Sequence, residues 1–181
     1  MTQGATEKQA EGISAEIPDW SREKKRFLEW APSRALLASI RSYQYWQSRT
    51  GLAASIGRKL ATFRHRFWSV VTGADIPVVT QIGGGLLMPH PNGIVVHCNA
   101  KIGPNCLLMQ RVTIGTRGGG VPNIGGHVDI GAGATVLGPL TVGNHAKIGA
   151  NALVIRDVPD GAIAMAPLAE IKLPIQAMKN D

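Results

Sequence analysis

Aliphatic residues recur at every sixth position through most of the second half of the chain. They are Ile76, Ile82, Met88, Val96, Ile102, Leu108, Ile114, Ile124, Ile130, Val136, Val142, Ile148 and Val154. A period of six fits neither an α-helix nor the simple alternation of a strand. It is typical of the hexapeptide repeat, in which three hexapeptides form one triangular coil. We therefore predict a left-handed parallel β-helix over residues 75–165, with about five coils stacked at the strand spacing of about 4.8 Å.

The six-residue count slips at two places. The step from Met88 to Val96 leaves extra residues around His90, and the step from Ile114 to Ile124 leaves extra residues in 116–122. In a solenoid each coil needs only its neighbours, so stacking does not require either insertion. Because irregular loops on a rigid scaffold commonly carry function, these two loops are the first candidates for a site.

The residues before the repeat favour helices. A short helix is expected over residues 22–30, and a longer one from an N-cap at Ser33 to about residue 49. A second helix is expected between Gly51 and Gly73, with Ile56, Leu60, Phe63, Phe67 and Val71 at helical spacing. We expect a helical region over residues 21–74 that packs on the β-helix or on a neighbouring subunit. Residues 1–20 are expected to be disordered, and residues 166–181 to cap the open end of the β-helix.

Composition separates the chain into the same two parts. The net charge is +7, and all of the Trp, Tyr and Phe residues lie before residue 73. The basic charges are interleaved with Glu and Trp and accompany no nucleic-acid motif, so we expect no nucleic-acid partner. Basic, Trp-rich helices suit a peripheral association with a membrane. Two unpatterned cysteines, Cys98 and Cys106, with no signal peptide and no long apolar run, favour a cytoplasmic protein.

The histidines supply the candidate chemistry. His90 lies in the first irregular loop, where it has no packing task, and a neutral imidazole can accept a proton at physiological pH. His127 and His145 are 18 residues apart, so we expect them to stack on adjacent coils. That arrangement is either half of a metal site or an exposed ladder, and we favour the ladder. Some hexapeptide β-helices are zinc carbonic anhydrases, but the histidine spacing here does not match theirs, so no metal is expected.

Two runs of sequence carry a family resemblance: HPNGIVVHCNAKIGPNCLLMQRVTIGTRGGG from His90, and IGGHVDIGAGATVLGPLTVGNHAKIGANALVIRDVPDGA after it. They resemble serine acetyltransferases and the related O-acetyltransferases of bacterial exopolysaccharide clusters, of the colanic-acid type. The resemblance covers about residues 36–165. It implies an acetyl-CoA-dependent O-acetyltransferase in which His90 is the general base and Asp75 orients it. A plain turn or cap is the alternative role for Asp75.

The same resemblance assigns further residues. It implies that the backbone at Gly115 and Thr116 donates a hydrogen bond to the thioester oxygen or the oxyanion formed from it. It also implies that acetyl-CoA lies against the small residues Ala132 and Ala150. Lys147 would lie near the nucleotide end of acetyl-CoA. The resemblance also implies a homotrimer, because active sites in this family form between subunits.

Two departures from the family pattern concern the acceptor. Serine acetyltransferases carry an aspartate before the catalytic histidine, where this chain has Pro89, and an Arg-His-Pro in the long loop, where it has Gly-Val-Pro with Val121. Arg117 is the only charged residue left in that loop to bind an acceptor. An amino acid needs partners for two charges, so we favour a sugar or exopolysaccharide hydroxyl, with serine as the alternative. A non-catalytic trimeric β-helix scaffold is the alternative from a different class.

Overall fold

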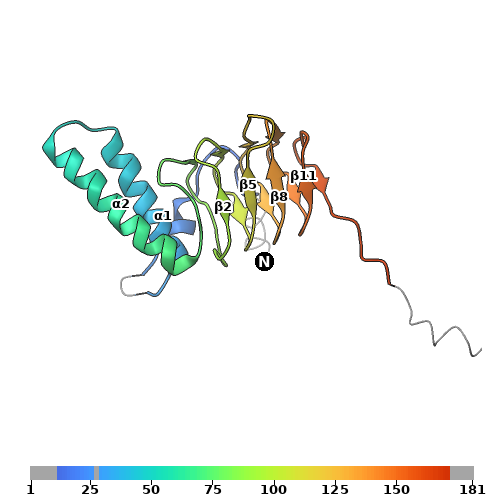
Figure 1. The fold of residues 1–181 in the computed structure, drawn as a ribbon, viewed down its shortest axis with the longest axis horizontal. Helices are drawn as coiled ribbons and strands as arrows, with labels where there is room; N and C mark the ends of the chain where they lie inside the picture. Colours follow the sequence, from blue (N-terminus) through green and yellow to red (C-terminus); the bar gives the residue numbers. More distant parts are fainter. Residues whose placement is uncertain (1–11, 27–28, 172–181) are drawn as a thin grey trace, which may run out of the picture.

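The computed structural model describes residues 12–26 and 29–171 of the chain. Two helices come first, followed by a parallel β-solenoid of about five turns (Figure 1). The predicted fold class is therefore confirmed. The helix pair projects from one end of the solenoid, and the chain leaves at the other end.

Short strands form three parallel sheets, one on each face of the solenoid. The β1 sheet contains β1 (Gln81–Ile82), β3 (Lys101–Ile102), β6 (Asn123–Ile124) and β9 (Thr141–Val142). The β4 sheet contains β4 (Leu107–Leu108), β7 (Asp129–Ile130), β10 (Lys147–Ile148) and β12 (Ile163–Ala164). The β2 sheet contains β2 (Val95–Val96), β5 (Thr113–Gly115), β8 (Thr135–Leu137) and β11 (Leu153–Val154).

The hexad residues form the core of the solenoid. All of the aliphatic positions that define the repeat are buried, from Ile76 to Val154. The second insertion does not disturb their stacking, because Ile102 pairs with Ile124 and Ile114 pairs with Val136 in register. The extra residues are therefore extruded from the wall of the solenoid, and the core stays continuous beneath them.

The helix pair differs in detail from the sequence prediction. α1 (Pro32–Gln47) begins at a proline with Ala31 in the N-cap position, so Ser33 lies inside the helix and does not cap it. Proline suits the first helical position because its missing N–H would have no partner there. The expected helix over residues 22–30 is a single 3-10 turn, η2 (Trp20–Glu23), and residues 27–28 lie outside the described residues.

α2 (Leu52–Thr72) buries a face that the apolar pattern did not indicate. Its buried residues are Ala54, Gly57, Ala61, His65 and Thr72, whereas the large apolar residues at helical spacing are exposed. Gly57 packs so closely on the Trp46 ring of α1 that a Cβ atom would collide with it. Small residues therefore set the approach of the two helices, and they leave an apolar face of α2 uncovered.

His65 joins α2 to the start of the solenoid. Its Nε2 lies 2.8 Å from the carbonyl oxygen of Ile76, to which it donates. Burial lowers the pKa of His65, while that hydrogen bond and the nearby Asp75 act in the opposite direction. From the sequence this histidine looks like any surface residue, because its burial follows from the packing of α2 on the solenoid.

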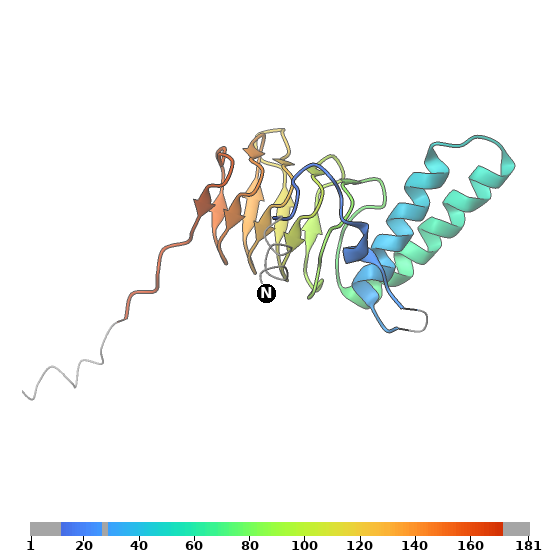
Figure 2. The same ribbon diagram turned by 180° about the vertical axis from the view of Figure 1, so that it is seen from behind.

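From residue 12 the N-terminal segment lies along the solenoid (Figure 2). Asn105 holds it: its side-chain amide donates to the carbonyls of Ser14 and Ile17 at 2.7 and 2.8 Å and accepts from the Asp19 N–H at 2.7 Å. Asn105 is fully buried, so these bonds satisfy a side chain that would otherwise be costly to bury. Residues 1–11 lie outside the described residues.

The C-terminal residues do not close the solenoid as far as they are described. Ala166 packs against the core, but Leu168 is 97% exposed and Ile171 is 87% exposed as the chain runs away from the last coil (Figure 1). The remainder of the expected cap, residues 172–181, lies outside the described residues.

Candidate active site

One corner of the solenoid is a ladder of left-handed residues. Its members are Gly73, Gly93, Arg111, Gly133 and Asn151, with φ between 58° and 72°. Each member after Gly73 is bonded to the turn before it; for example, the Arg111 N–H donates to the Asn92 carbonyl at 3.0 Å and the Asn151 N–H to the Ala132 carbonyl at 2.9 Å. Arginine in this conformation is strained relative to glycine, so the stacking of the coils overrides local preference there.

A groove of about 800 Å³ runs along this corner. We call it the corner groove; it is lined by Asn92, Gly93, Gln110, Arg111, Thr113, Ala132, Gly133, Thr135, Ala150 and Asn151. Ala132 and Ala150, the two small residues predicted to pass the cofactor, both lie in it. Their short side chains leave the floor of the groove open across two coils.

Asp75 lies in the coil that precedes the corner groove. The Asp75 N–H donates to the Ile94 carbonyl at 2.8 Å, and Asp75 forms a parallel bridge with Val95. This bridge places Asp75 first in an outward-facing row of the β2 sheet, followed by Val95, Thr113 and Thr135, of which the last two line the groove. His90 precedes the lining residue Gly93 by three positions. Both predicted catalytic residues are thus neighbours of lining residues, in register or in sequence, and neither lines the groove itself.

Asp75 and His90 are both exposed. Among the residues that the structure describes, no hydrogen bond joins the Asp75 carboxylate to the His90 imidazole. Catalytic hydrogen bonds are often long or open without substrate and form in the substrate complex. The pairing of the two side chains therefore stays a prediction.

The second insertion forms a small turn next to the β2 sheet. Arg117 and Gly120 exchange backbone hydrogen bonds of 3.2 and 3.4 Å, with Gly118 and Gly119 at positive φ between them. Positive φ at both central residues is the geometry of a tight type I′ turn. Gly115 ends β5, so Thr116 and Arg117 leave the solenoid directly from the strand that also supplies Thr113 to the corner groove.

Lys147 is separated from these residues. It lies on β10, in the β4 sheet, beside Asp129 in the register of that sheet. It is exposed and does not line the corner groove, although Ala150 three residues later does. From this position Lys147 could contact only the part of a long ligand that extends beyond the corner groove.

Gln110 was not selected by the sequence analysis. Its side-chain Oε1 is buried and has no hydrogen-bond partner among the described residues, and Gln110 lines the corner groove. A buried acceptor without a donor is costly, so it is a natural contact for an N–H group of a ligand. The sequence does not distinguish Gln110 from other polar residues of the repeat, so its unpaired oxygen could not be predicted.

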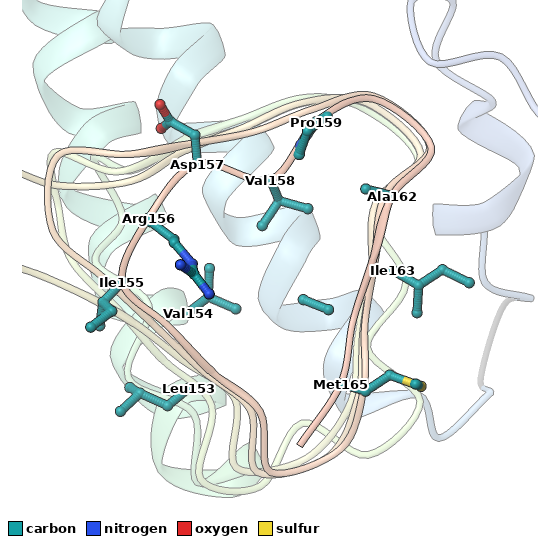
Figure 3. A pocket seen from close by; sticks show the side chains of 11 residues that line it. Leu153, Val154, Ile155, Arg156, Asp157, Val158, Pro159, Ala162, Ile163 and Met165 are labelled. Carbon is teal, nitrogen blue, oxygen red and sulfur yellow. The ribbon is translucent and has the colours of Figure 1, made fainter. Parts of the chain in front are cut away.

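A second hollow lies at the open end of the last coil, away from these residues (Figure 3). It has a volume of about 760 Å³ and is lined mostly by aliphatic side chains, with Arg156 and Asp157 among them. Val158 and Arg156 point into the opening of the coil, and Met165 lies at its rim. This hollow is the exposed end of the core, and none of the predicted site residues lines it.

His127 and His145 stack on adjacent coils, as their spacing indicated. Their Nδ1 atoms are 2.9 Å apart and their rings meet edge to face. Burial lowers the pKa of His127, which favours the neutral ring needed for one imidazole to donate to the other. Within residues 12–26 and 29–171, no group of three potential metal-ligating His, Cys, Asp or Glu side chains occurs.

Known proteins share both the sequence and the arrangement of this region. The chain is 38% identical to the serine acetyltransferase of Mycobacterium tuberculosis over 112 residues, 60% of this chain and 49% of the relative. A soybean serine acetyltransferase solved with serine matches at a TM-score of 0.64 and 34% identity, covering 78% of this chain and 57% of that one. A serine acetyltransferase solved with CoA matches at a TM-score of 0.64 and 32% identity. The match covers 76% of this chain and 55% of that one. No family model matches the chain.

The fold is that of a hexapeptide-repeat β-helix. Over the region that it shares with them, the chain is similar to serine acetyltransferases. The chain spans about half the length of the curated relatives that it matches.

Proposed function

We propose that the protein is an acetyl-CoA-dependent O-acetyltransferase whose acceptor is serine. The observation that carries this proposal is the corner groove, which is lined by Ala132 and Ala150 and by Thr113 and Thr135, in the strand row that continues through Val95 to Asp75. The likeness to a serine acetyltransferase solved with CoA supports acetyl-CoA as the donor. No other described groove combines small floor residues, an unpartnered polar atom and a neighbouring imidazole.

His90 acts as the general base in this proposal. An alcohol has too high a pKa to ionise at neutral pH, so its proton must leave as its oxygen attacks the thioester carbon. The His90 imidazole takes that proton while the new C–O ester bond forms. As the C–S bond breaks, the protonated His90 returns the proton to the departing sulfur, so the products are an acetyl ester and free CoA. Asp75 orients the ring and stabilises its positive charge.

The groove walls supply the remaining contacts. The backbone N–H groups of Gly115 and Thr116 donate to the developing oxyanion, and Gln110 Oε1 accepts from an amide N–H of the pantetheine arm. Lys147, on the adjoining sheet face, meets the phosphates of the nucleotide end. These contacts are proposals from the resemblance and from the placement of the residues.

The relatives favour serine over the sugar hydroxyl that we expected from the sequence. Arg117 is the one cation of the 116–122 loop, and its guanidinium suits the serine carboxylate. A sugar hydroxyl is the second candidate, because the apolar Pro89 and Val121 stand where the family pattern has polar residues. A sugar would not need partners for two opposite charges.

The test is release of free thiol from acetyl-CoA with serine and with a panel of sugars. We expect saturable release with serine, and Arg117→Ala should raise the KM for serine about tenfold or more, as expected for a lost charge-assisted contact. Arg156→Ala, an exposed arginine outside the groove, is the matched control. Release with sugars alone would overturn the serine assignment. Without any release or CoA binding, the scaffold alternative would stand.

A homotrimer is part of this proposal, since active sites in the family form between subunits. Mass measurement by light scattering on the purified chain tests it directly. A monomer with full activity would contradict a shared site.

A further inference from the structure

α2 presents an unpartnered apolar face. Leu52, Ile56, Leu60, Phe63, Phe67 and Val70 form this face, which we call the α2 stripe. Leu52, Phe63 and Val70 are 79%, 74% and 84% exposed, and the other members are at least half exposed. At about 100° per residue these positions share one side of the helix, opposite the side that packs on α1. A continuous apolar face of this kind marks an interaction site.

Basic residues flank the α2 stripe on both edges. Lys59 and Arg66 lie along one edge and Arg64 along the other, as their helical spacing requires, and all three are exposed. The helix pair from Pro32 to Thr72 contains seven Lys and Arg residues and no Asp or Glu. The surface around the stripe is therefore uniformly cationic.

One edge of the stripe is hollowed into a shallow groove of about 500 Å³, which Phe63 of the stripe also lines. Hydroxyl residues Tyr43, Ser55 and Thr62 line it together with the cations Arg58, Lys59 and Arg66. Arg58 is held by the carbonyls of Trp46 and Arg49, both at 3.3 Å. The ion pairs within the described residues are Arg41–Glu23 and Arg34–Glu29, so no carboxylate neutralises these three cations. The groove has the chemistry of an anionic phosphate site.

We propose that the α2 stripe and its basic rim dock on the surface of an anionic phospholipid bilayer. An amphipathic helix with large apolar residues on one face and Lys and Arg beside them lies in the plane of the membrane interface. The stripe enters the acyl boundary, and a lipid phosphate occupies the groove formed by Arg58, Lys59 and Arg66. Two facing copies of this surface would instead place cation against cation with no carboxylate to match them.

An aromatic pair lies beside Phe67 at the C-terminal half of α2. The ring centroids of Trp30 and Trp68 are 5.8 Å apart, the Phe67 ring meets that of Trp68 edge to face with centroids 5.0 Å apart, and Trp30 is 74% exposed. Tryptophan favours the headgroup level of a bilayer because its ring is apolar and its N–H is polar. Lys24, Lys25 and Arg26 are exposed a few residues before Trp30. No helix among the described residues has the length and apolar character to cross a membrane, so this contact is peripheral.

The test is co-sedimentation of the full chain with vesicles of phosphatidylcholine alone and with about one third phosphatidylglycerol. We expect binding to the anionic vesicles that weakens as salt rises, because exposed charges are screened. Phe63→Ser with Phe67→Ser should reduce binding at least tenfold. Lys59→Gln with Arg66→Gln should reduce it about tenfold or more at low salt, at about 1 kcal/mol per cation.

Matched controls carry the same changes at exposed positions of the solenoid: Leu153→Ser with Ile163→Ser, and Lys101→Gln with Arg156→Gln. Circular dichroism melting confirms that each variant is folded, and light scattering gives its mass. Failure to bind anionic vesicles would overturn the proposal. Phe63→Ser with Phe67→Ser lowering the oligomer mass would also overturn it, because the stripe would then be covered by a second copy.

Discussion

Two corners of the solenoid have the same backbone and different surroundings. The corner groove follows the ladder Gly73, Gly93, Arg111, Gly133 and Asn151, and a second ladder contains Gly85, Asn105, His127, His145 and Gly161. Both consist of left-handed residues, and after the first member of each ladder the N–H groups donate to the preceding turn; the bond at His127 is 2.7 Å and at Gly133 2.9 Å. The repeat therefore makes two equivalent corners.

The two corners differ in the residues that cover them. Residues 12–23 cover the first part of the second ladder: Asn105 is fully buried beneath them, and a Cβ on Gly126 would collide with the backbone of Ala15, whereas His145 and Gly161 are exposed. Nothing within the described residues covers the first ladder, and Gln110 Oε1 has no partner there. Corner conformation alone therefore does not define a site. A site requires an uncovered corner with polar atoms left to be satisfied.

The largest expected difference between the corners is catalytic. His90→Ala should lower kcat about 10²- to 10⁴-fold, the usual contribution of a general base. His145→Ala, on the second ladder, should leave kcat unchanged because that imidazole belongs to another corner and does not line the corner groove. Both variants are measured by thiol release from acetyl-CoA, with CoA binding as a check of the fold. Near-full activity of His90→Ala would remove the general-base assignment.

The next difference concerns stability. Asn105→Ala should lower the free energy of unfolding by about 2–4 kcal/mol, since it removes the side chain that bonds the Ser14 and Ile17 carbonyls and places alanine at positive φ. Asn151→Ala is the matched control: its φ is 58° against 60° at Asn105, but it is exposed, so only about 1 kcal/mol is expected. Denaturant unfolding measures both. If both variants lost the same free energy of unfolding, the bonds from Asn105 to the N-terminal segment would contribute nothing to stability.

The smallest expected effect is on donor affinity. Ala132→Leu fills the floor of the corner groove and should raise the KM for acetyl-CoA about tenfold with little change in stability, because the added atoms meet open space. Thr141→Leu, an outward residue of the β1 sheet, gives the control. An unchanged KM for acetyl-CoA in Ala132→Leu would mean that the donor follows another face of the solenoid.

The sequence predicted the features that depend on local order. The hexad period located the buried positions from Ile76 to Val154, and the slips in the count located the loops at His90 and Arg117. Both follow from stacking between neighbouring coils, so a one-dimensional count is sufficient to find them. The resemblance then supplied roles for Ala132 and Ala150, and the structure brings these two into one groove.

The features that escaped prediction depend on long-range contacts. Asn105 bonds residues about ninety positions earlier in the chain, and no periodicity records such a partner. α2 has an apolar repeat that indicates helix correctly, yet Gly57 and Ala61 take the buried face because the two helices approach closely. Gln110 is distinguished only by the absence of a partner, which is a property of the packed structure.

The uncovered last coil has a mechanical consequence. Beyond β11 and β12 the described chain adds no lid, whereas the first coil is bound to α2 through His65 and the second corner is held by residues 12–23. A stack whose units contact only their neighbours frays from its least protected end. Hydrogen exchange should therefore rise progressively from the first coil to the last. Local unfolding would begin at the C-terminal coil, and the coils near His90 would remain folded.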